Sequence, residues 1–82
     1  MFMENQRELS IGRLYKHFKG TMYKVIGVAE HTETGEPMVL YHRADDANKI
    51  WARPMDMFLS EVDHEKYPDV AQQMRFELVT PE

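Results

Sequence analysis

The sequence predicts an all-β fold, a small barrel of about five strongly bent antiparallel strands. Turn signals at Lys19–Thr21 and Thr32–Glu36 separate segments in which apolar and polar residues alternate, as they do in half-buried strands. The longest of these segments, Met22–His31, carries apolar side chains on both faces, which a flat sheet with one buried face would not require. We therefore expect this strand to bend and turn its inner face over at Gly27, because glycine inside a strand often marks a bend.

The first half of the chain is predicted to form two consecutive hairpins. The first joins a half-buried strand at Arg13–Phe18 to the long strand, and Gly20 between them tolerates the positive φ of a tight turn. The second joins the long strand to a strand at Pro37–Arg43 through the turn at residues 32–36, which is rich in threonine and glycine. Proline is tolerated at the start of that strand because it need not donate a hydrogen bond there.

The aromatic residues of these strands can serve either as core or as binding surface. A regular second hairpin places Gly27 opposite Tyr41, where the tyrosine ring can lie over the glycine. Trp51 and Tyr41 are both favoured as core residues, because a domain of this size needs large rings to build its interior. Tyr15 is favoured as a surface residue.

Shorter elements are predicted to complete the barrel. After a polar loop at Ala44–Lys49, a short strand at Ile50–Arg53 leads into a helical turn at Pro54–Phe58, where proline at the first position loses no hydrogen bond. Asp69 can cap a second short helical turn that runs to Met74. The alternating segment Arg75–Val79 is the last predicted strand.

Length and composition indicate a single soluble domain. The 82 residues are 43% hydrophobic and 29% charged, which is too apolar for a disordered chain. We expect residues 1–10 to form a flexible N-terminal segment and residues 11–80 to form the domain. No segment approaches the roughly 20 apolar residues of a membrane span, the first residues lack the pattern of a signal peptide, and cysteine is absent. These features favour a cytoplasmic protein without a membrane partner.

Several short motifs occur in the same order as in a small bacterial family. They read His17-Phe18-Lys19-Gly20, His31-Thr32-Glu33-Thr34 and Trp51-x-Arg53-Pro54-x-x-Met57-Phe58. Through these motifs the chain resembles the "domain of unknown function 1653" family over roughly residues 11–79. The resemblance implies an SH3-like barrel, in agreement with the bent strands above. It implies no activity, because the family is uncharacterised.

Two loops depart from the pattern of that family. The family usually runs from the Tyr41 strand into a loop that contains Leu-Tyr-Gly, whereas residues 42–48 here are more acidic and lack the aromatic residue and the glycine. Residues 66–74 are longer than the short turn that usually precedes the last strand. Ligand contacts that the family makes through these loops are not carried over to this chain.

The residues that commonly support catalysis or metal binding lack the required spacing. The four histidines form neither a His-x-His pair nor a His-Glu-x-x-His helix, and no cysteine can serve as a zinc ligand. Ser10 and Ser60 stand outside a Gly-x-Ser-x-Gly setting. Asp45, Asp46 and Asp56 would need an enclosing cleft to shift their pKa, and a small barrel is filled by its own side chains. We therefore predict a non-enzymatic protein with no catalytic residue, metal or cofactor; a small metal-dependent enzyme is the least favoured alternative.

The first functional hypothesis is a non-enzymatic binding or accessory module. SH3-like barrels bind extended ligands in aromatic-lined grooves between loops, here expected between Lys19–Thr21 and Ala44–Lys49. Trp51 beside Arg53 is a combination that is frequent at binding hot spots. The partner would be a protein, a peptide or a small ligand. The candidate ligand-binding residues are Tyr15, His17, Lys19, His31, Glu33 and Arg53.

The alternative hypothesis is binding of RNA or single-stranded nucleic acid through the basic first hairpin. All charged residues between positions 11 and 29 are positive, whereas those between 55 and 70 are mostly acidic. The net charge of −4 argues against strong duplex binding, which requires several cation–phosphate contacts. Exposed edge strands are compatible with a monomer or a homodimer. The candidate nucleic-acid-binding residues are Arg13, Lys16, Lys19, Lys24 and Tyr23.

Overall fold

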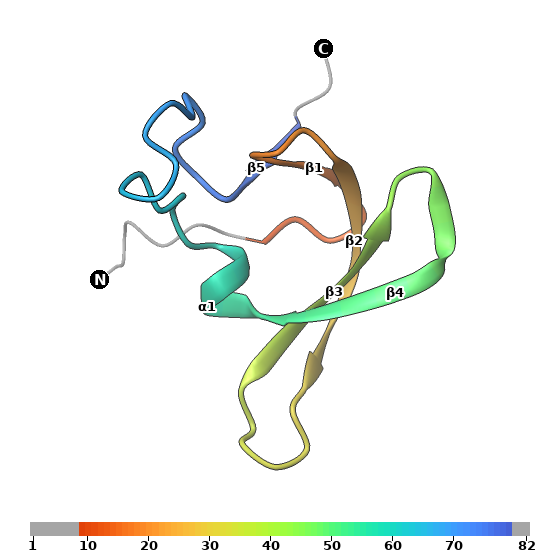
Figure 1. Ribbon diagram of the computed structural model, residues 1–82. Coiled ribbons are helices and arrows are strands. Elements are labelled where there is room, and N and C mark those ends of the chain that lie inside the picture. The colour runs from red at the N-terminus through yellow and green to blue at the C-terminus, as the bar shows by residue number, and fades with distance from the viewer. Residues whose placement is uncertain (1–8, 80–82) are drawn as a thin grey trace.

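A computed structural model describes residues 9–79 of the chain, and these residues form one antiparallel sheet of five strands in the order β4-β3-β2-β1-β5 (Figure 1). A single helical turn, α1 (Met55–Phe58), directly follows β4. The predicted all-β class is therefore confirmed. The strands are β1 (Leu14–His17), β2 (Met22–Glu30), β3 (Pro37–Arg43), β4 (Asp46–Pro54) and β5 (Phe76–Leu78).

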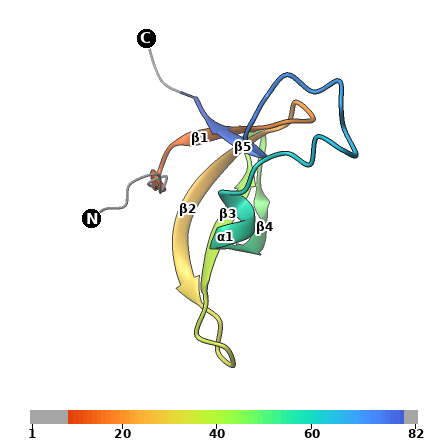
Figure 2. The same ribbon diagram turned by 90° about the vertical axis from the view of Figure 1, so that its left-hand side faces the viewer.

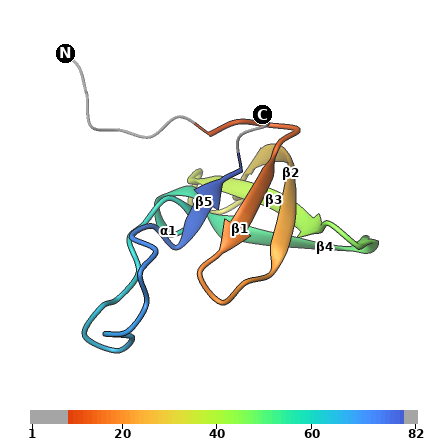
Figure 3. The same ribbon diagram turned by 90° about the horizontal axis from the view of Figure 1, so that it is seen from above.

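The sheet is strongly bent but does not close. β2 curves around the side that carries α1, here called the concave side (Figure 2), and β1 and β5 run across the direction of β3 and β4 (Figure 3). Within residues 9–79, β4 and β5 are the two edges and do not pair with each other. The predicted SH3-like barrel is therefore not confirmed, because the sheet does not close. The chain leaves the sheet at α1 directly after β4, and β5 is only three residues long, so the ladder that would join the edges is not formed.

A β-bulge in β2 produces the change of face that the sequence indicated. Val25 pairs with Tyr41, but Gly27 already pairs with Leu40, so Ile26 is an extra residue. Beyond such a bulge, even-numbered residues of β2 reach the face that odd-numbered ones reach before it. Apolar residues at odd-numbered positions before the bulge and at even-numbered positions after it therefore face the same side of the sheet.

The glycine next to this bulge has a smaller role than predicted. Gly27 does not adopt a positive φ, and a Cβ atom added to it would meet no other atom within 4 Å. The predicted pairing of Gly27 with Tyr41 is wrong by one residue, because the bulge shifts the register. The bend is thus a property of the bulge and does not require a glycine at this position.

The core on the concave side combines aromatic rings with the fully buried Val25 and Val39. Phe58 of α1 is fully buried, stacks on Phe76 with ring centroids 4.1 Å apart, and contacts Tyr15 and Tyr41 at 5.3 Å each. Burial of Tyr41 agrees with prediction. Tyr15, predicted at the surface, is only 1% exposed; its ring can be buried because its hydroxyl accepts a hydrogen bond from the Ser10 backbone N–H at 2.9 Å.

Trp51 is the large aromatic residue that the core leaves out. Its side chain is 44% exposed, so the expectation that it belongs to the core is wrong. Trp51 pairs with Tyr41 across β3 and β4 and thus lies on the concave side, but the space next to Tyr41 is already filled by Phe58 and Phe76. The core is complete without it.

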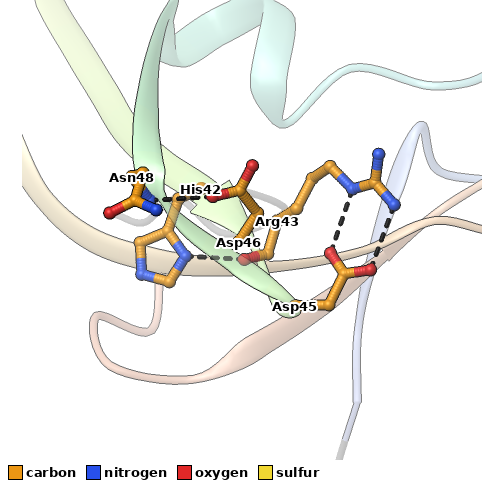
Figure 4. Close-up of polar contacts among 5 residues, drawn as sticks. All are labelled: His42, Arg43, Asp45, Asp46 and Asn48. Atoms are coloured by element: carbon orange, nitrogen blue, oxygen red, sulfur yellow. Dashed lines mark hydrogen bonds and ion pairs between the residues drawn. The ribbon is translucent and has the colours of Figure 1, made fainter.

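The turn between β3 and β4 is tighter than predicted. The expected loop at residues 44–49 and strand at 50–53 are replaced by a two-residue turn and a nine-residue strand. Arg43 donates two hydrogen bonds to Asp45, both at 3.1 Å, and the Asp46 side chain accepts one from the Asn48 backbone N–H (Figure 4). His42 Nδ1 lies 2.7 Å from the Arg43 carbonyl oxygen. These local bonds satisfy polar groups that a longer loop would expose to water.

A long loop connects α1 to β5 without a second helix. The helical turn predicted at Asp69–Met74 is absent from this part of the structure, so that prediction is wrong. The segment instead bonds to its neighbours, because Gln72 Nε2 donates to the carbonyls of both Lys16 and Met74 at 2.9 Å. Glu61 and Met74 form an isolated bridge.

The predicted N-terminal segment lies mostly outside the described residues, as does residue 80 at the predicted end of the domain. Of residues 1–10 only Leu9 and Ser10 are described. Leu9 packs against the core and Ser10 bonds to Tyr15. Among the helices of residues 9–79, none has the length and apolar character needed to cross a membrane.

Candidate functional site

One side chain from each of the five strands meets on the concave side of the sheet. We call this group the basic–aromatic cluster, and Phe76 of β5 is its centre. The other rings lie 4.9 to 5.8 Å from the Phe76 ring, and the guanidinium carbon of the arginine lies 5.8 Å from its centroid. The bent sheet thus brings together residues far apart in the sequence: His17, Tyr23, Tyr41, Arg53 and Phe76.

Arg53 is the charged member of this cluster. Its Nε donates a hydrogen bond to the Tyr41 hydroxyl at 3.1 Å, and its guanidinium lies over Phe76. The side chain is half-buried, yet within residues 9–79 it has no carboxylate partner. The two terminal NH₂ groups of its guanidinium are therefore available to a ligand, while Tyr41 fixes the plane of the fork.

His17 provides a hydrogen-bond donor beside Arg53. Its Nδ1 accepts a hydrogen bond from the Lys19 backbone N–H at 3.1 Å, so the neutral ring carries its proton on Nε2. Burial lowers the pKa of His17 from its usual 6.5, and the positive charges of Arg53, Arg75 and Lys19 lower it further. The charged side chains that lower this pKa are all cations, so positive charge gathers around His17.

Two more cations flank the cluster. Arg75 precedes Phe76, and its Nε donates to the Ser60 hydroxyl at 3.1 Å. Lys19 lies in the turn after β1, with its Nζ 5.5 Å from the centre of the Tyr67 ring. In the described chain neither side chain forms an ion pair with a carboxylate.

Arg43 shows the opposite arrangement. Its fork is occupied by both carboxylate oxygens of Asp45 in the β3–β4 turn (Figure 4). The contrast separates an arginine whose charge is locally balanced from Arg53 and Arg75, whose charges are not.

An open depression lies beside the cluster, between the two turns where the sequence predicted a groove. It has a volume of about 340 Å³ and is lined by Thr21, Met22, Arg43, Ala44 and Asp45. Arg43 in this lining is paired with Tyr23 of the cluster across β2 and β3, so the depression adjoins the cluster. None of the six predicted ligand-binding residues lines it.

The structure brings together only half of the predicted ligand-binding residues. His17, Lys19 and Arg53 meet, whereas Tyr15 is in the core. His31 and Glu33 belong to the turn between β2 and β3, which forms the tip of that hairpin (Figure 1). The Glu33 backbone N–H donates to His31 Nδ1 there at 3.1 Å. Their bonds organise that turn, at the end of the hairpin remote from the cluster.

Sequence reasoning missed Arg75 and Phe76 as members of the site. The available signal was the alternation of Arg75–Val79, which predicted a strand but not its neighbours. Only the pairing of β5 with β1 places Phe76 opposite His17.

The predicted nucleic-acid-binding residues are divided between the two faces of the sheet. Tyr15 and Tyr23 pair on the concave side, so their strand neighbours Lys16 and Lys24 point to the convex side. Lys16 also lies opposite Glu77 of β5. Arg13, Lys16 and Lys24 are exposed, and Lys16 and Lys24 do not share a face of the sheet with Tyr23.

No group of three or more histidine, aspartate or glutamate side chains in residues 9–79 is placed to hold a metal ion.

The fold and the site define a small, open β-sheet domain with a basic and aromatic concave surface.

Comparison with known proteins gives the family. The profile described as "Protein of unknown function (DUF1653)" matches residues 13–78. A crystal structure of a protein of that family from Bordetella bronchiseptica is 32% identical, covers 87% of this chain and 92% of its own, and superposes with a TM-score of 0.63. No curated protein matches the chain. The chain belongs to the DUF1653 family, as the motifs of the sequence predicted.

Proposed function

We propose that this protein is a non-enzymatic binding module that holds an acidic group of its ligand at the basic–aromatic cluster. The observation that carries the proposal is the half-buried guanidinium of Arg53, which has an anchored Nε and no carboxylate partner among residues 9–79. Partial burial of an unbalanced cation costs free energy. A carboxylate or phosphate that accepts two hydrogen bonds from the fork compensates this cost with good geometry.

The neighbours of Arg53 support the same ligand chemistry. His17 offers its Nε2 proton, and Arg75 and Lys19 add positive charge without adding an acceptor. A site rich in donors and cations favours an anion and disfavours a cation. Because the neutral His17 would gain a favourable partner when an anion binds, its pKa rises in the complex and binding strengthens as the pH falls.

The adjoining depression extends the surface available to a ligand. Its lining joins Thr21 of the β1–β2 turn to Asp45 of the β3–β4 turn, and Arg43 in this lining is paired with Tyr23 of the cluster. A ligand held at Arg53 can therefore continue between the two turns. This supports recognition of an extended partner, since the cluster itself provides few contacts.

A titration of the full chain with tripolyphosphate, a simple multivalent anion, tests the proposal. Amide NMR signals of β1, β4 and β5 are expected to shift for the unaltered protein. Arg53→Gln should weaken the interaction about tenfold to a hundredfold, because hydrogen bonds to charged groups contribute about 1.5–3 kcal/mol. Lys24→Gln, which removes an exposed lysine from the convex side, is the matched control and should bind normally.

Two results would overturn the proposal. One is that tripolyphosphate leaves the signals of the cluster unchanged in a folded protein. The other is that Arg53→Gln and Lys24→Gln weaken binding equally. Because loss of the bond to Tyr41 could disturb the core, Arg75→Gln serves as a second variant, and a several-fold loss of affinity is expected.

A further inference from the structure

We infer that the acidic group bound at this site is a phosphate of single-stranded nucleic acid, and that Trp51 stacks on the adjoining base. The inference rests on the proposed function and adds the chemical class of the ligand. The juxtaposition that carries it is a cation, a ring and a second cation on one strand, β4. These are Lys49, Trp51 and Arg53.

Trp51 has the geometry of a stacking platform. Its side chain is exposed on the concave side, and Lys49 Nζ lies 5.0 Å from the centre of its ring. Over the described residues Trp51 has no aromatic neighbour, unlike the rings of the core. Lys49 covers one face of the indole, and a planar group can lie on the other. Exposed aromatic side chains bind single-stranded bases in this way without a strong sequence preference.

Trp51 is coupled to the anion site through Tyr41. The two residues are paired across β3 and β4, and the Tyr41 hydroxyl accepts the hydrogen bond that anchors Arg53. Trp51 and Arg53 are two residues apart on the same strand, a separation of about 6.6 Å along it. A ring on Trp51 and an anion on Arg53 are therefore adjacent groups of one ligand.

The order of these groups favours a nucleic acid over an acidic peptide. A single strand of nucleic acid alternates phosphates with bases, as β4 alternates cations with a ring. A peptide made of acidic residues alone would satisfy Arg53 and Lys49 but has no ring to place on Trp51. The cations of β4 differ from Lys16 and Lys24 of the first hairpin, which point to the opposite face.

Fluorescence of the full chain tests the inference, because Trp51 is the one tryptophan of the sequence. A short oligodeoxythymidylate is expected to quench this fluorescence. A matched oligomer with abasic sugars keeps the phosphates but should bind about tenfold more weakly without quenching. If three cations contact phosphates, the logarithm of the binding constant should fall with the logarithm of salt concentration with a slope of about −2.

Variants separate stacking from charge, with binding followed through a dye on the oligomer. Trp51→Ala should lose about five-fold to a hundred-fold in affinity for the oligomer and retain its affinity for tripolyphosphate. Trp51→Leu keeps apolar bulk on the sheet and guards against a folding defect, and it should show the same selective loss. Lys24→Gln is again the control on the convex side.

Failure of this inference is distinguishable from failure of the proposed function. If tripolyphosphate binds but the abasic oligomer binds as tightly as the complete one, the inference is wrong and the anion site stands. The inference is equally wrong if a polyglutamate peptide binds more tightly than the oligomer. If no probe binds the folded chain, both are wrong.

Discussion

Replacing Phe58 by alanine tests whether the helical turn α1 completes the core. Phe58 is fully buried, is stacked on Phe76 at 4.1 Å and contacts Tyr15 and Tyr41. Truncation of such a phenylalanine costs about 3–5 kcal/mol. A domain of this size has a free energy of unfolding of roughly 4–12 kcal/mol, so the variant should lose a large share of its stability.

Urea unfolding followed by circular dichroism measures this loss. With a slope of roughly 1 kcal/mol per molar urea, the midpoint should fall by about 3 M or more. Met57→Ala is the matched control on the same turn, because Met57 is 45% exposed, and it should change stability by about 0.5 kcal/mol or less. A loss below about 1 kcal/mol for Phe58→Ala, or equal losses for both variants, would refute the assignment of α1 to the core.

Two further predictions concern the backbone and the pH dependence of stability. Gly20→Ala should lower the free energy of unfolding by about 1–2 kcal/mol, because Gly20 has a φ of 106°. Gly27→Ala should leave stability unchanged or raise it, since Gly27 has no positive φ and has room for a Cβ. Thermal unfolding compares the two variants, and equal losses of stability would contradict this prediction. The pKa of His17 in the folded chain lies below 6.5, its usual value in the unfolded chain. When the pH falls through 6.5, the unfolded chain therefore binds more protons than the folded chain, and the folded state loses stability. Relative to His17→Asn, whose amide oxygen can still accept the Lys19 N–H, the original protein should become less stable from about pH 7 to about pH 5, and a pH-independent difference in urea midpoint would show that the lowered pKa is wrong.

The order and kinds of the elements could be predicted because they depend on local signals. Apolar and polar residues alternate along β2 and β3, which constrains the backbone of those segments. The glycine of the first turn and the proline before α1 likewise constrain the backbone near them. The apolar residues on both alternations of β2 also indicated a change of face. Their pattern could not distinguish a glycine hinge from a bulge at Ile26, because the two differ in pairing across strands and not in composition.

Closure of the sheet and the members of the site depend on distant contacts. Whether β4 meets β5 is decided by the path of residues 55–75, which carries weak periodicity. Tyr15 can be buried because the Ser10 backbone N–H donates a hydrogen bond to its hydroxyl. Trp51 is exposed because Phe58 and Phe76 fill the space beside Tyr41. Of the cluster, His17 and Arg53 were predicted as ligand-binding residues and Tyr23 as a nucleic-acid-binding residue, but their meeting at Phe76 required the strand order.

The guanidinium NMR signals of Arg53 and Arg75 most directly test the central claim, that a bent, open sheet presents unbalanced arginines to an anion. During a tripolyphosphate titration of the full chain, the Nε–Hε signals of both residues should move together with one dissociation constant, while that of Arg43, already paired with Asp45, should stay in place. Movement of Arg43 alone, or of none of the three in a folded protein, would contradict the account.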